Sequence, residues 1–290
     1  MPLKRQKTGS VVCPSCGLLV GVRDGKCYNC GRSNPGLWGF APLVRHFGGQ
    51  FNFVSLVVWG CCILYVLSLV ATLGMGQNIG MGGFFDILAP SSTSLVLLGA
   101  AGAYPVFYLG SWWTILSASW LHGSLLHILF NMLWVRDIGP AVEEVFGSAR
   151  TIIIFTIAGV VGFLCSSVAG LWMGGPGVPF FMRGATLTIG ASASIFGLLG
   201  ALVHYGRRGG GHLIHREAWM YAIILFAFGL FFPGIDNYAH AGGFIGGFLA
   251  SMLLDPARRE RTDHLMIAFG CLAATALAIL ASVVHVLALV

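Results

Sequence analysis

The stretch LTIGASASIFGLLGA, residues 187–201, is apolar and rich in small side chains, yet it contains the hydroxyls of Ser192 and Ser194. It belongs to a chain of 290 residues that is 57% hydrophobic and only 9% charged. A soluble globular domain carries about 25% charged residues. We therefore predict an all-α polytopic membrane protein, in which a serine within an apolar segment needs an explanation.

Apolar runs recur along the chain, and a helix that crosses a bilayer needs roughly 20 mostly apolar residues. The N-terminus lacks the early apolar core of a cleavable signal peptide, so we expect the protein to be held by its own spans. The predicted spans are residues 52–74, 118–135, 151–173, 190–206, 218–233, 238–254 and 264–290.

The placement of lysine and arginine predicts the orientation, because cytoplasmic loops carry an excess of both. With a cytoplasmic N-terminus, all 16 of these residues except Arg183 fall inside. The long segment 75–117 contains neither, as expected of an outer loop. The net charge of +6 is thus explained by the orientation of the chain in the membrane, and it gives no support for a nucleic-acid partner. We expect a multi-pass protein of the plasma or inner membrane, with Val290 on the outer side.

Two Cys-x-x-Cys pairs lie in CPSCGLLVGVRDGKCYNC, residues 13–30. Four thiolates complete a tetrahedral zinc shell and leave no position for a water, so we predict a structural zinc whose binding is coupled to folding. A disulfide or redox pair is the alternative, which a cytoplasmic location disfavours. The role of this zinc-knuckle module is open between docking a partner and capping the membrane domain. The predicted ligands are Cys13, Cys16, Cys27 and Cys30.

Polar side chains within the spans usually face the bundle interior and mark function. His127 and Asn131 are four residues apart, which places them on one helix face. His240 precedes Gly243 and Gly247, a spacing that lets a neighbouring helix approach closely. One serine or histidine alone would be read as a structural residue. Polar residues on three spans, beside glycines that allow close packing, could bring a serine hydroxyl within hydrogen-bond distance of a histidine imidazole. That contact is the minimum for a nucleophile activated by a base.

Four segments in order resemble the rhomboid family of intramembrane serine proteases. They are HGSLLHILFNMLW (122–134), AVEEVFG (141–147), GASASIFGLLGA (190–201) and AHAGGFIGG (239–247). The resemblance covers about residues 50–255.

The resemblance implies a role for each matching residue. Ser192 is similar to the family's nucleophile and His240 to its general base, which form a dyad. His127 and Asn131, with the backbone N–H of Ser192, resemble the oxyanion hole. The supporting residues are His122 and Phe196, and Glu143 and Gly147 resemble a structural turn.

Three positions depart from the family pattern. Ala193 follows the serine where glycine is usual, and Phe196 stands where tyrosine is common. The first outer loop has Trp113-Thr114 in place of Trp-Arg. No catalytic group is lost, so the resemblance still implies activity, with the anchoring of that loop in question.

The resemblance also implies the organisation and the function. We expect a six-helix core with a seventh C-terminal helix, and an endopeptidase that cleaves transmembrane segments of other proteins near the outer membrane surface. Its partners would be these substrates and the lipid bilayer, and no cofactor would be needed for catalysis. The predicted divisions are a cytoplasmic zinc-knuckle module at 1–35, an interfacial linker at 36–50, the catalytic core at 51–256, and a linker with the extra helix at 257–290.

Several alternatives stay open at this point. Asp236 lies four residues before His240 and could complete a triad, and Ser194 is a rival nucleophile. A non-catalytic relative that binds membrane clients for quality control is the main competing function. A transporter or channel is a weaker alternative, because paired charges would be expected within its spans and this sequence has none there. A zinc protease would need His-Glu-x-x-His, which is absent, and an aspartyl protease would need two intramembrane aspartates.

Overall fold

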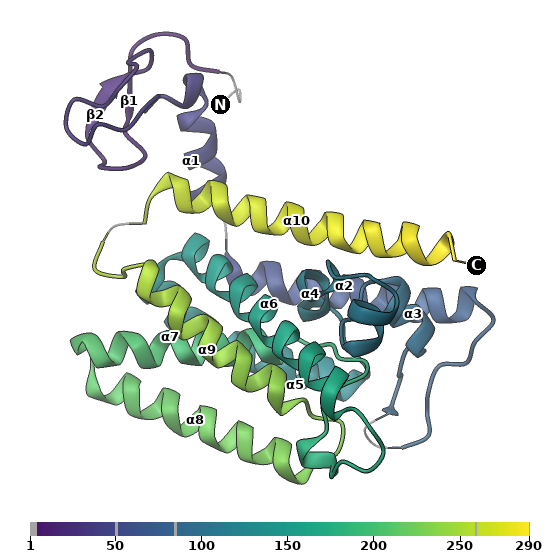
Figure 1. The fold of residues 1–290 in the computed structure, drawn as a ribbon. Coiled ribbons are helices and arrows are strands. Elements are labelled where there is room, and N and C mark those ends of the chain that lie inside the picture. Colours follow the sequence, from purple (N-terminus) through teal and green to yellow (C-terminus); the bar gives the residue numbers. More distant parts are fainter. Residues whose placement is uncertain (1–4, 50–51, 84–85, 259, 290) are drawn as a thin grey trace.

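The computed structural model describes residues 5–49, 52–83, 86–258 and 260–289, and it is mostly helical (Figure 1). A small N-terminal module with a two-stranded antiparallel sheet lies beside a bundle of helices. The strands are β1 (Ser10–Val12) and β2 (Leu19–Gly21). The helices are α1 (Ala41–Gly49), α2 (Phe53–Gly74), α3 (Ser92–Leu97), α4 (Thr114–Ser117), α5 (Leu125–Phe146), α6 (Ser148–Met173), α7 (Ser192–Tyr205), α8 (His212–Phe231), α9 (Asn237–Leu253) and α10 (Thr262–Leu287).

Within the described residues, four helices are long and apolar enough to cross a membrane, namely α2, α6, α8 and α10. The other three predicted spans correspond to α5, α7 and α9, of which α7 has only 14 residues. A helix of that length rises about 21 Å, less than the roughly 30 Å of a hydrocarbon core. Residues 193–204 of α7 are all buried, so α7 is an internal helix of the bundle.

The second predicted span differs from the structure in its bounds. We predicted residues 118–135, but Ala118–Trp120 forms a single 3-10 turn and α5 begins only at Leu125. The Ser124 hydroxyl accepts a hydrogen bond from the backbone amide of His127 and so caps the helix. A cap supplies the partner that a first-turn amide lacks. It leaves no trace in hydropathy, which is why the prediction started too early.

Helix α7 packs against α6 and α9 through glycines. A Cβ added to Gly197 would lie 2.0 Å from the Cβ of Ala158 on α6. A Cβ added to Gly243 on α9 would lie 2.0 Å from the carbonyl oxygen of Ala193. Both distances are shorter than any van der Waals contact, so a side chain at either position would push the helices apart. The close approach expected from the glycine spacing is therefore present.

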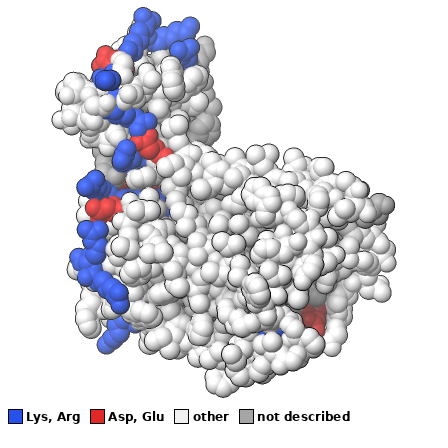
Figure 2. All heavy atoms as spheres, viewed as in Figure 1, with Lys and Arg blue, Asp and Glu red and all other residues white. Residues whose placement is uncertain are grey.

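Lysine and arginine gather at one side of the molecule. Figure 2 shows them over the N-terminal module and along the adjoining edge of the bundle, whereas most of the visible bundle surface carries neither. The helices of the bundle run away from this edge in the same view of Figure 1. The charge distribution therefore separates one end of the bundle from the rest.

Candidate active site and metal centre

The candidate active site lies where α7 begins. Gly190 has a φ of +122°, a region that favours glycine, and its amide donates to the carbonyl of Ala118 at 2.9 Å. Helix α7 starts two residues later with Ser192. The first amides of a helix have no acceptor within it, and they form the positive end of its dipole. Negative charge that develops beside Ser192 is therefore stabilised by its position.

Ser192 and His240 lie within hydrogen-bond distance. Ser192 Oγ is 3.0 Å from His240 Nε2, which comes from the first turn of α9. His240 is buried, whereas Ser192 is partly exposed. The glycine contacts between α7 and α9 make this approach possible. The structure thus brings together the two residues that the sequence pattern paired.

The Phe196 ring stacks on the imidazole of His240. Their ring centroids are 4.2 Å apart and the two planes meet at 16°. Phe196 lies one turn after Ser192 on α7, so the same helix presents both the hydroxyl and the ring. The stack restricts the rotation of His240, the role expected for an aromatic ring at this position.

His127 faces the same turn from α5. Its Nδ1 accepts a hydrogen bond from the amide of Gly123 at 3.2 Å. A neutral imidazole has one acceptor and one donor nitrogen, so Nε2 carries the hydrogen. A Cβ on Gly190 would lie only 2.6 Å from that Nε2. The His127 donor is therefore directed at the turn that precedes Ser192.

Asn131 and His122 lie around His127 in different ways. The Asn131 side-chain amide donates to the carbonyl of His127 at 2.8 Å, and its Oδ1 has no partner among the described residues. One amide hydrogen of Asn131 is thus used within α5. His122 is fully buried, and its ring lies 5.1 Å from that of His127 in an edge-on arrangement. Neither ring nitrogen of His122 has a hydrogen-bond partner in the described part of the chain.

Asp236 does not contact the His240 ring. Its Oδ1 accepts from the amide of Ala239 at 3.0 Å and so caps α9. Its Oδ2 accepts from the Thr188 hydroxyl at 2.7 Å. His240 Nδ1 has no hydrogen-bond partner among the described residues, so the triad alternative is not formed.

Ser194 points away from the site. It is fully buried, and its hydroxyl is 2.9 Å from that of Ser119. A Cβ on Gly159 of α6 would lie 2.8 Å from the Ser194 hydroxyl, so this side chain fills the contact between α6 and α7. The rival nucleophile is therefore a packing residue in this structure.

Glu143 and Gly147 form the turn between α5 and α6. Glu143 Oε1 accepts from the amide of Phe53 at 2.8 Å and from the Ser148 hydroxyl at 2.6 Å. Gly147 has a φ of +82°. Beside this turn, Glu260 accepts from the amide of Arg150 at 2.9 Å. Glu260 was not singled out from the sequence, because its partner is 110 residues away.

The structure also contains polar pairs that the sequence analysis did not single out. Ser251 Oγ on α9 is 2.9 Å from His204 Nδ1 on α7, and both side chains are buried. Thr188 and Ser166 both donate to the Asp236 carboxylate. The signal for the first pair was available, since both residues are polar groups within predicted spans. The partners of Asp236 have no sequence signal, because they meet only in the fold.

The four predicted metal ligands form one cluster. Their sulfur atoms all lie within 4.8 Å of one another, with Cys13–Cys30 at 3.7 Å and Cys16–Cys27 at 3.6 Å. A zinc ion with sulfur ligands at about 2.3 Å in tetrahedral geometry requires sulfur–sulfur distances of about 3.8 Å. The cluster therefore fits a tetrahedral ion. The backbone amide of Leu18 is the main cause that lowers the pKa of the Cys16 thiol to about 6, whereas desolvation and the other three cysteines raise the pKa of Cys30 to about 11.

Both cysteine pairs have the same backbone geometry. The amide of Gly17 donates to the carbonyl of Cys13 at 3.0 Å, and that of Gly31 donates to Cys27 at 2.9 Å. Both glycines have positive φ, +81° and +71°. The small core of the module, however, includes Leu37, which lies beyond the predicted boundary at residue 35.

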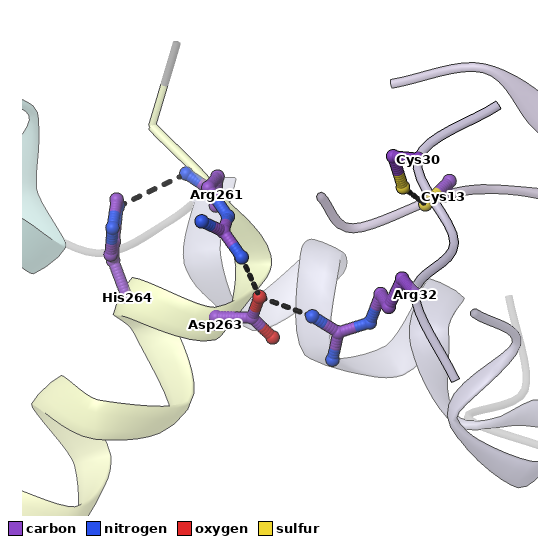
Figure 3. A network of polar contacts seen from close by, with 6 residues as sticks. All are labelled: Cys13, Cys30, Arg32, Arg261, Asp263 and His264. Carbon is purple, nitrogen blue, oxygen red and sulfur yellow. Dashed lines mark hydrogen bonds and ion pairs between the residues drawn. The ribbon is translucent and has the colours of Figure 1, made fainter. Parts of the chain in front are cut away.

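The N-terminal module docks on the start of α10 (Figure 3). The Arg32 guanidinium pairs with the carboxylate of Asp263, which also accepts from Arg261 at 2.9 Å. The backbone amide of Thr262 donates to the carbonyl of Pro14 at 3.1 Å. Pro14 directly follows a predicted metal ligand, so the knuckle itself contacts the last helix.

The C-terminal half of α10 holds the loop that precedes α4. The indole N–H of Trp113 donates to the hydroxyl of Ser282 at 3.0 Å, and His285 Nε2 lies 3.0 Å from the carbonyl oxygen of Leu109. The departure at Trp113-Thr114 had left the anchoring of this loop in question. In this chain, α10 supplies the anchor.

Comparison with known proteins places the chain in a family. The Rhomboid domain model matches residues 109–256, about half of the chain, and this stretch contains the whole candidate active site. The chain belongs to the rhomboid family, as its four motifs indicated.

Similar proteins include RHOMBOID-like protein 4 of Arabidopsis thaliana, 32% identical over 177 residues, which are 58% of this chain and 40% of the relative. RHOMBOID-like protein 7 of the same plant is 32% identical over 177 residues, 58% of this chain and 51% of the relative. Rhomboid protease GluP of Bacillus subtilis is 34% identical over 148 residues, 50% of this chain and 26% of the relative. The matched part therefore spans about half or less of these relatives.

Proposed function

We propose that this protein is an intramembrane serine endopeptidase that cleaves transmembrane segments of other membrane proteins near the outer membrane surface. One observation carries the proposal, the 3.0 Å approach of Ser192 Oγ to His240 Nε2 at the start of α7. Membership of the rhomboid family and the similarity to a rhomboid protease support it. The comparisons cover only part of each relative, so the activity is inferred for this chain from its own site.

Ser192 acts as the nucleophile and His240 as its general base. A neutral serine is a weak nucleophile until a base accepts its proton. The proton moves from Ser192 Oγ to His240 Nε2 as the oxygen attacks the substrate carbonyl, and it later passes to the leaving amine. The stacked Phe196 ring holds the imidazole in place of a carboxylate, since Asp236 is engaged elsewhere.

The oxyanion is stabilised by donors that are already in position. The backbone N–H of Ser192 lies at the positive end of α7, and His127 Nε2–H faces the adjoining turn. Asn131 retains one amide hydrogen beyond the one it gives to His127. Each donor in such a site contributes about 10²–10³ in rate.

The substrate is a transmembrane helix that must be locally unwound. Within a bilayer, every peptide group of a helix is hydrogen-bonded inside the helix, so the scissile carbonyl is not accessible until a turn opens. Small or helix-breaking residues near the outer surface favour that opening. Water for the second half of the reaction enters from the same side.

The protein spans the membrane several times, with a cytoplasmic N-terminus and an outer C-terminus. The basic residues at one end of the molecule support this orientation (Figure 2), because cytoplasmic segments carry the excess of lysine and arginine. The bilayer is then the plasma or inner membrane. No feature of the charge pattern requires a nucleic-acid partner.

The N-terminal module holds a structural zinc ion through its four cysteines. Four thiolates leave no open position on the metal, so the ion supplies folding energy to the module and takes no part in the cleavage. Zinc content measured on the purified full chain should be one ion per chain. Substitution of Cys13 and Cys27 by serine should remove it, and a metal-free wild-type chain would contradict the assignment.

A non-catalytic rhomboid-like protein that binds membrane clients is the second candidate function. Such a protein would have no need of a serine and a histidine in hydrogen-bond contact. The Ser192–His240 contact therefore favours the protease.

The deciding experiment compares cleavage of a transmembrane substrate in proteoliposomes by the wild type, Ser192→Ala and Ser194→Ala. Ser192→Ala should abolish cleavage and labelling by a fluorophosphonate. Ser194→Ala is the matched control, because it removes the same hydroxyl two residues away, and it should keep cleavage. Cleavage that persists in Ser192→Ala would reject the proposal.

A further inference from the structure

We propose that Asp236 is a positioning residue, whose carboxylate ties the segment before Ser192 to the beginning of the helix that carries His240. The inference rests on the proposed function, because it concerns how the same two side chains are held. Asp236 acts through other residues, since its carboxylate contacts neither the hydroxyl of Ser192 nor the imidazole ring of His240.

The contacts of Asp236 reach three parts of the bundle. Its Oδ2 accepts from Thr188 Oγ1 at 2.7 Å, and Thr188 lies in the segment that leads into α7. Its Oδ1 accepts from the backbone amide of Ala239 at 3.0 Å, within the first turn of α9. The hydroxyl of Ser166 on α6 also donates to Oδ2.

The spacing of these contacts matches the site. Thr188 lies four residues before Ser192, and Asp236 lies four residues before His240. The amide of His240 donates to the carbonyl of Asp236 at 3.1 Å, so the two residues are one helical turn apart. Two hydrogen bonds, at 2.7 Å and 3.0 Å, therefore connect the same two segments of chain. The first does not take part in the proton transfer and sets the separation for the second.

The remaining contacts of the segment before Ser192 lead elsewhere. Thr188 exchanges both backbone hydrogen bonds with Ala101, at 2.8 Å and 3.1 Å, and the amide of Gly190 donates to Ala118. These bonds fix the segment to the region before α5. In the described part of the chain, the Thr188–Asp236 contact is the hydrogen bond that links residues 187–191 to α9.

Capping of α9 alone does not account for a carboxylate here. A helix cap requires one acceptor oxygen, and serine, threonine or asparagine supplies it as well as aspartate. Oδ1 performs that task. Oδ2 accepts two hydroxyl donors in addition, from Thr188 and Ser166, which serine at this position could not reach. The second oxygen is the part of Asp236 that carries the positioning role.

The test uses two substitutions that remove the hydrogen bond between Thr188 and Asp236 and keep the fold. Thr188→Val replaces a hydroxyl by a methyl of similar size. Asp236→Ser keeps an oxygen that can cap α9 but removes the carboxylate oxygen that accepts from Thr188. Each should lower kcat by about tenfold to a hundredfold with KM nearly unchanged, because a misplacement of about 1 Å costs up to a hundredfold in rate. The double variant should lose no more than Asp236→Ser alone, since Asp236→Ser already removes the contact with Thr188. Thr188→Ser, which keeps the hydroxyl, should restore the rate.

Ser166→Ala is the matched control. It removes the other donor to Oδ2, but Ser166 belongs to α6 and not to the segment before Ser192. It should lower thermal stability and change kcat less than Thr188→Val does. Equal losses of kcat in both variants would indicate a purely structural role for Asp236 and overturn the proposal.

A second readout does not depend on catalysis. In the Ser192→Ala background, Thr188→Val should speed hydrogen exchange at the amides of Thr188 and Gly190 several-fold relative to Ser192→Ala alone. Unchanged hydrogen exchange, or unchanged kcat in Thr188→Val, would overturn the proposed positioning role of Asp236. If the wild type shows no cleavage that depends on Ser192, the proposed function fails and the exchange measurement alone decides on Asp236.

Discussion

Helices α7 and α9 carry two Ser–His pairs, one at each end, and only one of them has the properties of an active site. At the beginning of both helices, Ser192 on α7 faces His240 on α9 at 3.0 Å. Toward their ends, the arrangement is reversed, and Ser251 on α9 faces His204 on α7 at 2.9 Å. The distances are nearly equal, so distance alone does not make a nucleophile.

The direction of the proton distinguishes the pairs. Ser251 donates its hydroxyl hydrogen to the carbonyl of Phe248 at 2.7 Å, so it accepts from His204 Nδ1. A hydroxyl has one hydrogen to give. His204 is thus the donor in its pair and cannot act as the base. Ser192 has no competing carbonyl within the described hydrogen bonds, so its hydrogen is available to His240.

The position in the helix also differs. Ser192 is the first residue of α7, where unpaired amides favour negative charge. Ser251 lies two residues before the end of α9, where unpaired carbonyls disfavour it. A contact between serine and histidine is therefore not sufficient for an active site. The serine must also donate its hydrogen to the histidine, and it must lie at the N-terminal end of its helix.

The largest difference should appear when the two histidines are exchanged for glutamine. His240→Gln should lower kcat/KM for a transmembrane substrate by about 10⁴-fold, the loss typical of a missing general base. His204→Gln should keep activity within a few-fold, because its ring only donates to Ser251. Cleavage rates in proteoliposomes measure both, and equal losses would refute the distinction between the pairs.

A methyl group at Gly190 should have the next largest effect. Its Cβ would lie 2.6 Å from His127 Nε2, so Gly190→Ala should displace that donor and lower kcat by about 10²–10³-fold. Gly209→Ala is the control, since Gly209 also has positive φ, +89°, but a Cβ there meets nothing within 4 Å. If both variants lose the same activity, backbone strain is the cause and His127 is not involved.

The aromatic rings beside the histidines offer a smaller test. Phe196 stacks flat on His240 with centroids 4.2 Å apart, whereas Phe248 meets His204 edge-on at 5.3 Å. Phe196→Leu should lower kcat about tenfold, since an aromatic pair contributes roughly 0.5–1.5 kcal/mol beyond its buried area. Phe248→Leu should leave kcat unchanged. A loss confined to KM in Phe196→Leu would argue against a role in holding the base.

The smallest effect concerns stability. Ser251→Ala leaves the buried Nδ1–H of His204 without an acceptor, which should cost about 1–3 kcal/mol of unfolding free energy. Ser192→Ala should cost less, because Ser192 is partly exposed. Denaturation of both variants in detergent measures the difference. A greater destabilisation by Ser192→Ala would mean that the two pairs share a structural role.

Much of the core could be predicted from short-range patterns. The glycine spacing after His240 indicated a close helix contact, and two Cys-x-x-Cys pairs indicated a cluster of four sulfurs, because each pattern is local in sequence. The start of α5 could not be predicted in this way. It depends on the Ser124 cap, which hydropathy does not register.

The partners of Asp236 illustrate the limit for the site itself. Thr188 is 48 residues away and Ser166 is 70 residues away, so no spacing connects them to Asp236. The sequence analysis singled out Asp236 because it lies four residues before His240, and it considered Asp236 as the third member of a catalytic triad. The fold gives that carboxylate other donors, which only three-dimensional packing can determine.

The contact between Arg32 and Asp263 joins the beginning of the chain to its last helix across 231 residues. At roughly 5–20 residues per second of synthesis, about 10–50 s pass before the ribosome has made the surface that receives the module. During that delay the two cysteine knuckles lack their contacts with α10, and the proposed metal ion would be the main source of order within the module. A nascent chain arrested before Thr262 should therefore present a folded but unattached metal-binding head.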